Sequence, residues 1–258
     1  MRPLTKSVKM IDIAIDYPFL FFKRKATGKA PTSWDELTEQ QFIAISRTIH
    51  GAEPDFRFLS ILTGIGKNLL KKLTPVHLLR LSEQVEFIGK AGNVHSEFII
   101  NQIAGYVCPK PKLNSLTFGQ FIFADSHYND WQSGKRSKAL NNLIASLYLL
   151  PGEKFDNETI PERAAIISST DPDIRRAIAF NYGLILKWIA GCYPLLFNSS
   201  EEDVVGANDI RPKQSGWLKL FESLVGDDLI NRDRYAEIPI HTVFRYLTTK
   251  YKENAKQS

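Results

Sequence analysis

Residues 31–42 of this chain, PTSWDELTEQQF, carry the sequence signal that decides its fold class. Thr38 can accept a hydrogen bond from the backbone N–H of Gln41, and the Gln41 side chain can accept one from the backbone N–H of Thr38, which forms a capping box. Leu37 can pack against Phe42 across the first turn as a hydrophobic staple. The stretch therefore predicts a helix that begins just after Thr38.

The same helix start recurs further along the chain. LTFGQF at 116–121 repeats the Leu, Thr, Gln and Phe of LTEQQF at 37–42 with identical spacing, and LTPVHL at 73–78 is a looser version with Pro75 at the first helical position. Staple plus capping box is a general device, and no repeat of fixed period runs through the chain. We therefore interpret these stretches as recurring helix starts and not as an internal duplication.

The rest of the chain is also mostly helical in pattern. Residues 8–15 (VKMIDIAI) and 18–23 (PFLFFK) read as two strands, and KRKATGKAP, residues 23–31, reads as a linker. From Ser33 onward, apolar residues recur at helical spacing. The sequence predicts a mainly α fold of roughly eight to ten helices with a small N-terminal β element. The two strands can pair within this chain or add to the sheet of another chain.

Changes in composition suggest four segments. The sequence NSSEEDVVGANDIRPKQSG after Phe197 is the longest polar stretch and reads as a surface loop, and two short amphipathic helices follow it. The predicted division is therefore a β element with its linker, a helical core domain, a polar loop, and a C-terminal helix pair with a solvated tail: residues 1–30, 31–197, 198–216 and 217–258.

Composition limits the class of protein. With 43% apolar and 24% charged residues, the 258-residue chain has enough material for a folded core. Its two cysteines, Cys108 and Cys192, are too few for a disulfide framework, and its N-terminus lacks the apolar core of a signal peptide. We therefore expect a reduced, intracellular setting.

One segment, residues 177–197 (AIAFNYGLILKWIAGCYPLLF), is long enough to span a bilayer. It contains Lys187 near its centre, together with Asn181 and Pro194. Because a charged side chain in mid-membrane is costly, we expect a buried core helix here and no membrane span.

The search for a reactive centre finds no motif. The five histidines are scattered, and Asp125 and His127 stand two positions apart, which directs them to different sides of a helix. GIGKNLL at 64–70 has neither the first glycine nor the final Ser or Thr of a phosphate loop. We therefore expect no catalytic residues, no metal, no cofactor and no enzymatic activity.

Charge permits a nucleic-acid partner but does not imply one. The net charge is +5, yet the basic clusters are dispersed and interleaved with acidic residues, as on solvated helix faces. Nucleic acid is therefore an unlikely partner. Trp217 follows the polar loop, on a short helix with Leu220 and Phe221, so that this helix can dock either onto its own domain or onto another chain.

Several stretches resemble proteins of the tail-module region of tailed phages and prophages. Over most of residues 30–251 the resemblance lies in helix starts and apolar spacing, and it is closest to tail assembly chaperones, which precede the tape-measure protein. The stretches are PTSWDELTEQQF, LTFGQFIFAD at 116–125, ALNNLIASLYLLPGEKFD at 139–156, Pro-Glu-Arg at 161–163, YPLLF at 193–197, WLKLFESLVGDDL at 217–229 and PIHTVFRYLTTKY at 239–251.

The resemblance implies a non-enzymatic assembly factor in the cytoplasm of the host cell. Such a protein would bind helical segments of the tape-measure protein, and also the tail-tube subunit, by burying their apolar faces in a groove. The partner-binding residues expected on the C-terminal helix pair are Trp217, Leu220, Phe221, Phe244, Tyr246 and Leu247.

Three alternatives stay open at this point. The β element and the polar loop also suit a structural tail or head-tail joining subunit that stays in the virion. The pI of 9.1 leaves room for a nucleic-acid-binding regulator, and residues 177–197 for a membrane-associated factor.

Overall fold

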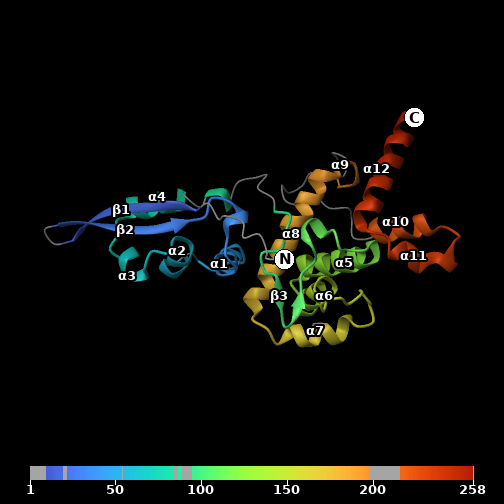
Figure 1. The fold of residues 1–258 in the computed structure, drawn as a ribbon, viewed down its shortest axis with the longest axis horizontal. Helices are drawn as coiled ribbons and strands as arrows, with labels where there is room; N and C mark the ends of the chain where they lie inside the picture. The colour runs from blue at the N-terminus through green and yellow to red at the C-terminus, as the bar shows by residue number, and fades with distance from the viewer. Residues whose placement is uncertain are drawn as a thin grey trace. The chain divides into compact units, whose positions relative to one another are not determined.

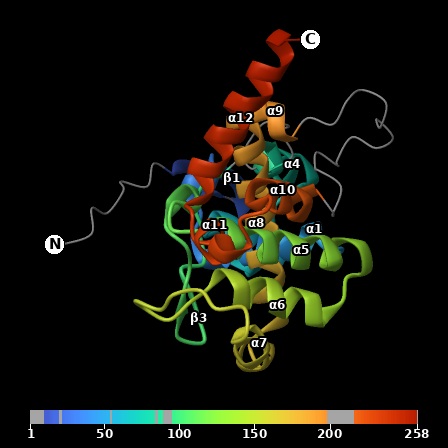
Figure 2. The same ribbon diagram turned by 90° about the vertical axis from the view of Figure 1, so that its right-hand side faces the viewer.

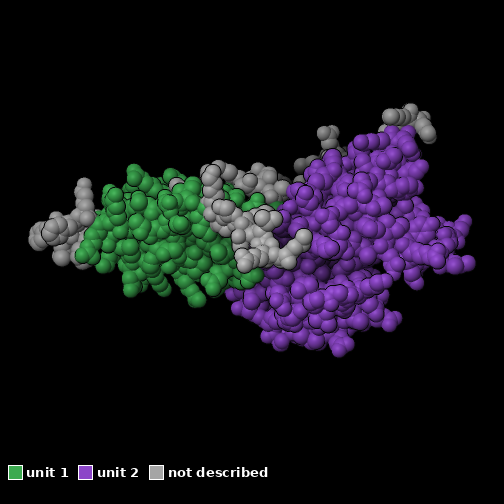
Figure 3. Space-filling model, in the orientation of Figure 1, with its two compact units in different colours: residues 1–95 green, residues 96–258 purple. Residues whose placement is uncertain are grey.

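The computed structural model describes residues 10–19, 22–53, 55–83, 86–88, 95–197 and 216–257. The chain divides into two compact units, residues 1–95 and residues 96–258 (Figure 3). Their boundary falls inside the stretch 31–197, which the sequence analysis treats as one helical domain. The polar loop predicted at 198–216 lies outside the described residues, except for Gly216, which begins a helix.

The first unit combines a two-stranded antiparallel sheet with short helices (Figure 1). Its elements are β1 (Ile11–Phe19), β2 (Phe22–Ala30), the 3-10 helix η1 (Trp34–Glu36), α1 (Glu39–Ile49), α2 (Phe56–Thr63), α3 (Lys67–Leu70), α4 (Pro75–Glu83) and the 3-10 helix η2 (Glu86–Ile88).

β1 and β2 pair with each other, so the pairing within this chain, one of the two left open by the sequence, is the one observed. The second strand predicted at 18–23 is wrong in position, because residues 18–19 end β1 and β2 begins at Phe22. Along β1, buried side chains alternate with exposed ones, as expected for a sheet with one face on a core. The inward side chains meet apolar residues from α3, α4 and the loops beside them. This core comprises Ile13, Ile15, Tyr17, Ala26, Ala30, Ile65, Leu70, Leu73 and Leu81.

The linker predicted at 23–31 is wrong, because residues 22–30 form β2. The amino-acid composition of residues 23–30 did not indicate a strand, because the only β-branched residue in this stretch is Thr27. Its pattern is complementary to β1 instead: Lys25 lies opposite Asp16 and Lys29 opposite Asp12. Cross-strand pairs of opposite charge stabilise a sheet, so pairing with β1 compensates for the low intrinsic strand propensity of β2.

Gly28 brings β2 close to the loop after α2. A Cβ atom on this residue would lie 2.2 Å from the Thr63 carbonyl oxygen and 2.7 Å from Cγ1 of Ile65. The backbone at the C-terminal end of α2 thus packs directly on the strand, with no room for a side chain between them.

The second unit is mostly helical, and its longest described helix is α8 (Pro172–Cys192). Among the described residues it contains a small hairpin of β3 (Gln102–Ile103) and β4 (Tyr106–Val107), which the sequence analysis did not predict, and ten further elements. These are the 3-10 helix η3 (Pro111–Leu113), α5 (Phe118–Gly134), α6 (Ser137–Leu147), α7 (Ile160–Ser168), α8 (Pro172–Cys192), α9 (Pro194–Phe197), α10 (Gly216–Val225), the 3-10 helix η5 (Leu229–Asn231), α11 (Arg232–Ala236) and α12 (Ile240–Gln257).

Helix α8 explains the apolar run that raised the membrane question. It begins after its N-cap Asp171, and much of its surface is buried against the rest of the unit. Its Asn181 is fully buried and satisfied, because its side chain accepts a hydrogen bond from the Ile99 N–H (2.7 Å) and donates one to the Glu97 carbonyl (2.9 Å). Asn181 therefore serves packing within the unit, while Lys187 is exposed.

The prediction of a mainly α protein with a small N-terminal β element is confirmed. The described residues form twelve α-helices, of which α3, α9 and α11 have only four or five residues. The C-terminal tail, expected to be solvated, continues α12 to Gln257.

The predicted helix starts are also present, with one addition. Thr38 and Gln41 form the full capping box, and Thr117 accepts from the Gln120 N–H (3.2 Å). Both glutamines are buried, and each amide nitrogen donates to a carbonyl near the end of the following helix. Gln41 donates to Leu62 (3.1 Å) and Gln120 donates to Ser146 (2.8 Å).

Replacing Gln120 by Leu should destabilise the pairing of α5 and α6. The Ser146 carbonyl would lose its donor in a buried place, which costs about 1–3 kcal/mol. Amide hydrogen exchange in α6, followed by mass spectrometry, should become faster in Gln120→Leu. Gln132→Leu, nearer the exposed end of α5, is the matched control. Unchanged exchange in Gln120→Leu would contradict this role of the amide.

Replacing Gly28 by Ala should destabilise the first unit, because the new methyl group would overlap the Thr63 carbonyl. Overpacking of this kind costs about 1–3 kcal/mol. Hydrogen exchange of amides in β2 and α2 should accelerate. Gly66→Ala is the control, since a Cβ atom there would have no heavy atom within 4 Å. Equal exchange rates in the two variants would show that the close approach carries no energetic weight.

Candidate functional site

The six residues predicted to bind a partner lie on α10 and α12, but most of them are not exposed. Four are buried in their own chain: Trp217, Phe221, Phe244 and Leu247. Leu220 is partly exposed, and Tyr246 is 50% exposed. The predicted set therefore separates into an internal group and an external one.

The internal group belongs to an aromatic cluster that holds the C-terminal helices against the body of the second unit. Trp217 lies at its centre, with ring centroids 5.1–5.3 Å from those of Phe121 on α5, Phe197 on α9 and Phe244 on α12. The cluster also includes Phe118, Phe221 and Tyr193. Edge-to-face and tilted ring pairs at these distances are favourable beyond their burial of apolar area.

Hydrogen bonds fix the start of α12 at the same place. The Phe118 N–H donates to the Ile238 carbonyl (2.8 Å), and the Ile240 N–H donates to the Leu116 carbonyl (3.1 Å). The ring of His241 bridges two further elements, since Nε2 lies 2.6 Å from the Lys112 carbonyl and Nδ1 lies 2.9 Å from the Tyr193 hydroxyl. With Nε2–H as donor and Nδ1 as acceptor, the neutral ring satisfies both contacts.

Of the two docking modes left open for Trp217, the structure shows the one onto its own domain. Trp217 is only 3% exposed and Phe244 is fully buried. Neither ring can contact a partner while this cluster is intact. Trp188 lies in the run 177–197, for which the sequence analysis expects a buried core helix, but it is only partly buried, with the Lys112 ammonium 5.7 Å from its ring centre.

The exposed apolar residues of the same region lie elsewhere. Leu229 and Ile230, adjacent in η5 between α10 and α11, are 71% and 97% exposed. Leu218 on α10 and Tyr251 on α12 are about half exposed. We call the group Leu218, Leu229, Ile230, Tyr246 and Tyr251 the C-terminal apolar set.

Helix α12 extends this set beyond the body of the unit. The buried face formed by Phe244 and Leu247 continues at helical spacing to Tyr251, which is 47% exposed. Figures 1 and 2 show the C-terminal half of α12 running past the neighbouring helices α9 and α10. The apolar face is therefore longer than the surface that covers it.

Sequence reasoning missed Leu229, Ile230 and Tyr251. A signal was present for the first two, because Leu229-Ile230 is an apolar pair enclosed by charged residues in DDLINRDR, 227–234. Such a pair between two short helices has no obvious place in either helix face. The burial of the residues around Trp217 could not be predicted from the local sequence, because it depends on contacts with α5 and α9.

Among the described residues, the side chains able to do chemistry include a paired histidine and carboxylate, since His95 Nδ1 lies 3.1 Å from Asp35 Oδ1. Within the described ranges, no group of three or more His, Cys, Asp and Glu side chains is arranged to hold a metal ion. Asp125 accepts a hydrogen bond from the Asn129 amide (2.9 Å), and burial lowers the pKa of His127. Burial also raises the pKa of the Cys108 thiol to about 11, so that it is almost wholly protonated at neutral pH.

Comparisons with known proteins give no match for this chain, whether with models of protein families, with curated proteins or with solved structures. Among the described helices, none has both the length and the apolar character needed to cross a membrane.

Replacing Trp217 by Ala should release α10 and α12 from the body of the second unit. Loss of a buried indole costs about 3–5 kcal/mol, since a cavity replaces its ring contacts. Hydrogen exchange of amides in α10 and in the first half of α12 should increase strongly. Tyr246→Ala removes a half-exposed ring from the same helix pair and should change little. Similar exchange in both variants would show that the cluster does not hold these helices.

Proposed function

We propose that this protein is a non-enzymatic assembly factor that binds helical segments of other proteins through its C-terminal apolar set. The observation that carries this proposal is the exposure of Leu229 and Ile230 in η5, which follows α10, a helix that buries Trp217 in its own unit. Burying such a side chain is worth roughly 1.5–3 kcal/mol. An exposed pair therefore offers substantial binding energy to a partner.

The kind of partner follows from the shape of this region. An amphipathic helix presents apolar residues at i, i+3, i+4 and i+7, and it can lay them against other helices. The C-terminal apolar set comes from α10, η5 and α12, which supply both short helical surfaces and the projecting end of α12. A partner rich in helices with exposed apolar faces therefore suits this surface better than a partner with a flat, polar surface.

The narrower proposal concerns the biological setting. Resemblance to tail assembly chaperones, over most of residues 30–251, supports a role in building a phage tail in the host cell. The partner is then the long helical tape-measure protein, with the tail-tube subunit as a second partner. Masking the apolar faces of the tape-measure protein until the tube polymerises requires binding alone, without chemistry.

Trp217, Phe221, Phe244 and Leu247 take a different role in this proposal from the one expected from sequence. They hold α10 and α12 in place, so that the exposed residues are presented in a fixed arrangement. Substituting them would weaken a complex indirectly, through loss of structure. The test of binding must therefore use exposed positions.

Co-expression with a tape-measure protein, the partner proposed here, should yield a complex that Leu229→Ser combined with Ile230→Ser weakens. We expect at least about a tenfold loss of affinity by titration calorimetry, because two apolar contacts would be lost. The melting temperature of the free protein should not change, since both side chains are exposed.

The control is Ile166→Ser, which removes a 45% exposed apolar residue from α7 of the same unit. It should leave affinity unchanged. Equal loss in both variants, or no complex with the wild-type chain, would contradict the proposal. Mass spectrometry of purified particles separates it from the alternative, because a structural subunit would be retained in stoichiometric amount.

A further inference from the structure

A cavity of about 420 Å³ runs along β1 in the first unit. Among the residues whose side chains the structure describes, its walls are the consecutive residues 11–16 of β1 together with His77, Arg80 and Leu81 of α4, and none of them belongs to β2. Residues from both faces of one strand can line a single cavity only along the edge of that strand. The cavity therefore lies on the edge of β1 that faces away from β2.

This edge has no strand partner within the described part of the chain, where β1 pairs only with β2. An open edge presents backbone N–H and C=O groups that another strand can bind. In β-augmentation an extended segment adds to such an edge, and pockets beside it select the alternate side chains of the segment.

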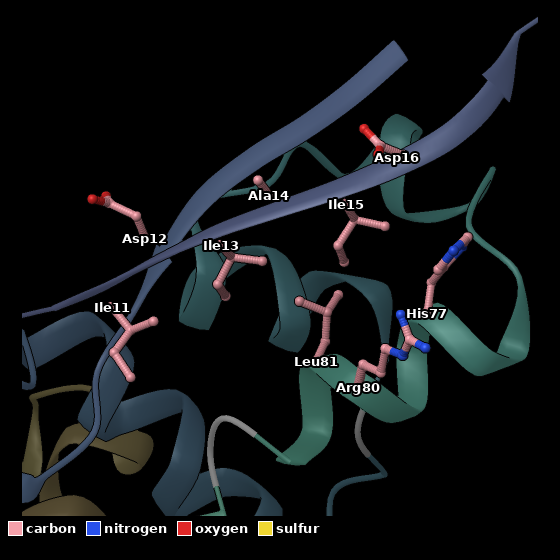
Figure 4. A pocket seen from close by; sticks show the side chains of 9 residues that line it. All are labelled: Ile11, Asp12, Ile13, Ala14, Ile15, Asp16, His77, Arg80 and Leu81. Carbon is pink, nitrogen blue, oxygen red and sulfur yellow. The ribbon is translucent and has the colours of Figure 1, made fainter. Parts of the chain in front are cut away.

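The two faces of the β1 edge differ in chemistry. Figure 4 shows Ile13 and Ile15 pointing toward α4, where Leu81 faces them, while Asp12 and Asp16 point to the other side. Arg80 and His77 stand on α4 at the rim of the cavity. An added strand would thus meet Ile13, Ile15 and Leu81 on one face and two carboxylates on the other.

Strand β2 shows what β1 accepts as a partner. Opposite the two carboxylates it carries Lys25 and Lys29, with the Lys29 ammonium 3.9 Å from the Asp12 carboxylate. Its inward residues are small. A strand on the open edge with basic residues at the corresponding outward positions would repeat this charge pairing.

A second copy of this chain fits the edge poorly. Pairing β1 with β1 of another copy would bring two acidic rows together, because residues 11–17 contain Asp12 and Asp16 and no basic residue. Pairing with β2 of another copy would supply lysines, but its inward Ala26, Gly28 and Ala30 are too small to fill the cavity.

We propose that the open edge of β1 binds an extended segment of another protein, in which outward Lys or Arg residues alternate with large apolar residues that enter the cavity. The backbone of the segment pairs with β1, and its basic side chains face Asp12 and Asp16. This site uses no residue of the C-terminal apolar set, so it does not depend on the function proposed for that region.

The probe is a fluorescein-labelled peptide of sequence Lys-Val-Thr-Val-Lys-Val with blocked ends, titrated into the full-length protein at low salt and followed by anisotropy. We expect saturable binding. Lys-Pro-Thr-Pro-Lys-Pro has the same charge but cannot pair as a strand, and it should not bind. Glu-Val-Thr-Val-Glu-Val keeps the strand pattern, and repulsion from the carboxylates should weaken its binding.

Variants of the protein locate the site. Asp12→Asn combined with Asp16→Asn should weaken binding of the lysine peptide about three- to tenfold, as expected for two cross-strand charge pairs. Arg80→Trp, which places an indole at the rim of the cavity, should weaken it as well. Glu53→Gln removes an exposed carboxylate elsewhere in the unit and should have no effect.

Three results would overturn the proposal. Equal binding of the proline peptide would mean that charge alone attracts the probe. Unchanged affinity in the double asparagine variant would move the binding away from β1. Self-association of the protein in sedimentation, abolished by the same double variant, would assign the edge to a second copy.

Discussion

A buried glutamine amide is the interaction on which both units of this protein depend. Gln41 and Gln120 each stand at the third position of a helix, where the side chain of the preceding threonine cap accepts from their backbone N–H. Their amide nitrogens reach the carbonyls of Leu62 and Ser146, near the C-terminal ends of the next helices. Helix ends leave carbonyls without partners, so one residue both completes a helix start and satisfies a helix end.

This interaction explains how much of the fold the sequence could predict. Capping by Thr38 and Thr117 involves residues three positions apart, so the helix starts were readable from the sequence alone. The contacts with Leu62 and Ser146 span 21 and 26 residues, and no local sequence pattern predicts contacts at that separation. Strand β2 was not predicted for the same reason, because it is stabilised by the pairing of Lys25 and Lys29 with residues of β1.

The candidate site could be predicted only in part, and the reason is again non-local. An apolar helix such as α10 shows which residues avoid water, but it does not show what covers them. Phe121 and Phe197 cover Trp217, so the most conspicuous aromatic residue became an internal anchor. The residues left for a partner, Leu229 and Ile230, stand in a charged segment where helical periodicity carries no information.

The two proposed surfaces would recognise partners by different means. Beside α10 and α12, binding rests on apolar side chains, whose burial is non-directional and tolerates partners of varied sequence. Along β1, hydrogen bonds from the backbone fix the direction and register of an added strand, and Asp12 and Asp16 demand a charge pattern. High salt screens charges on an exposed strand but does not weaken apolar burial. A rise in ionic strength would therefore distinguish the two surfaces, because it would weaken binding of the strand segment by about the three- to tenfold that its charge pairs contribute and leave the affinity of the helical partner unchanged.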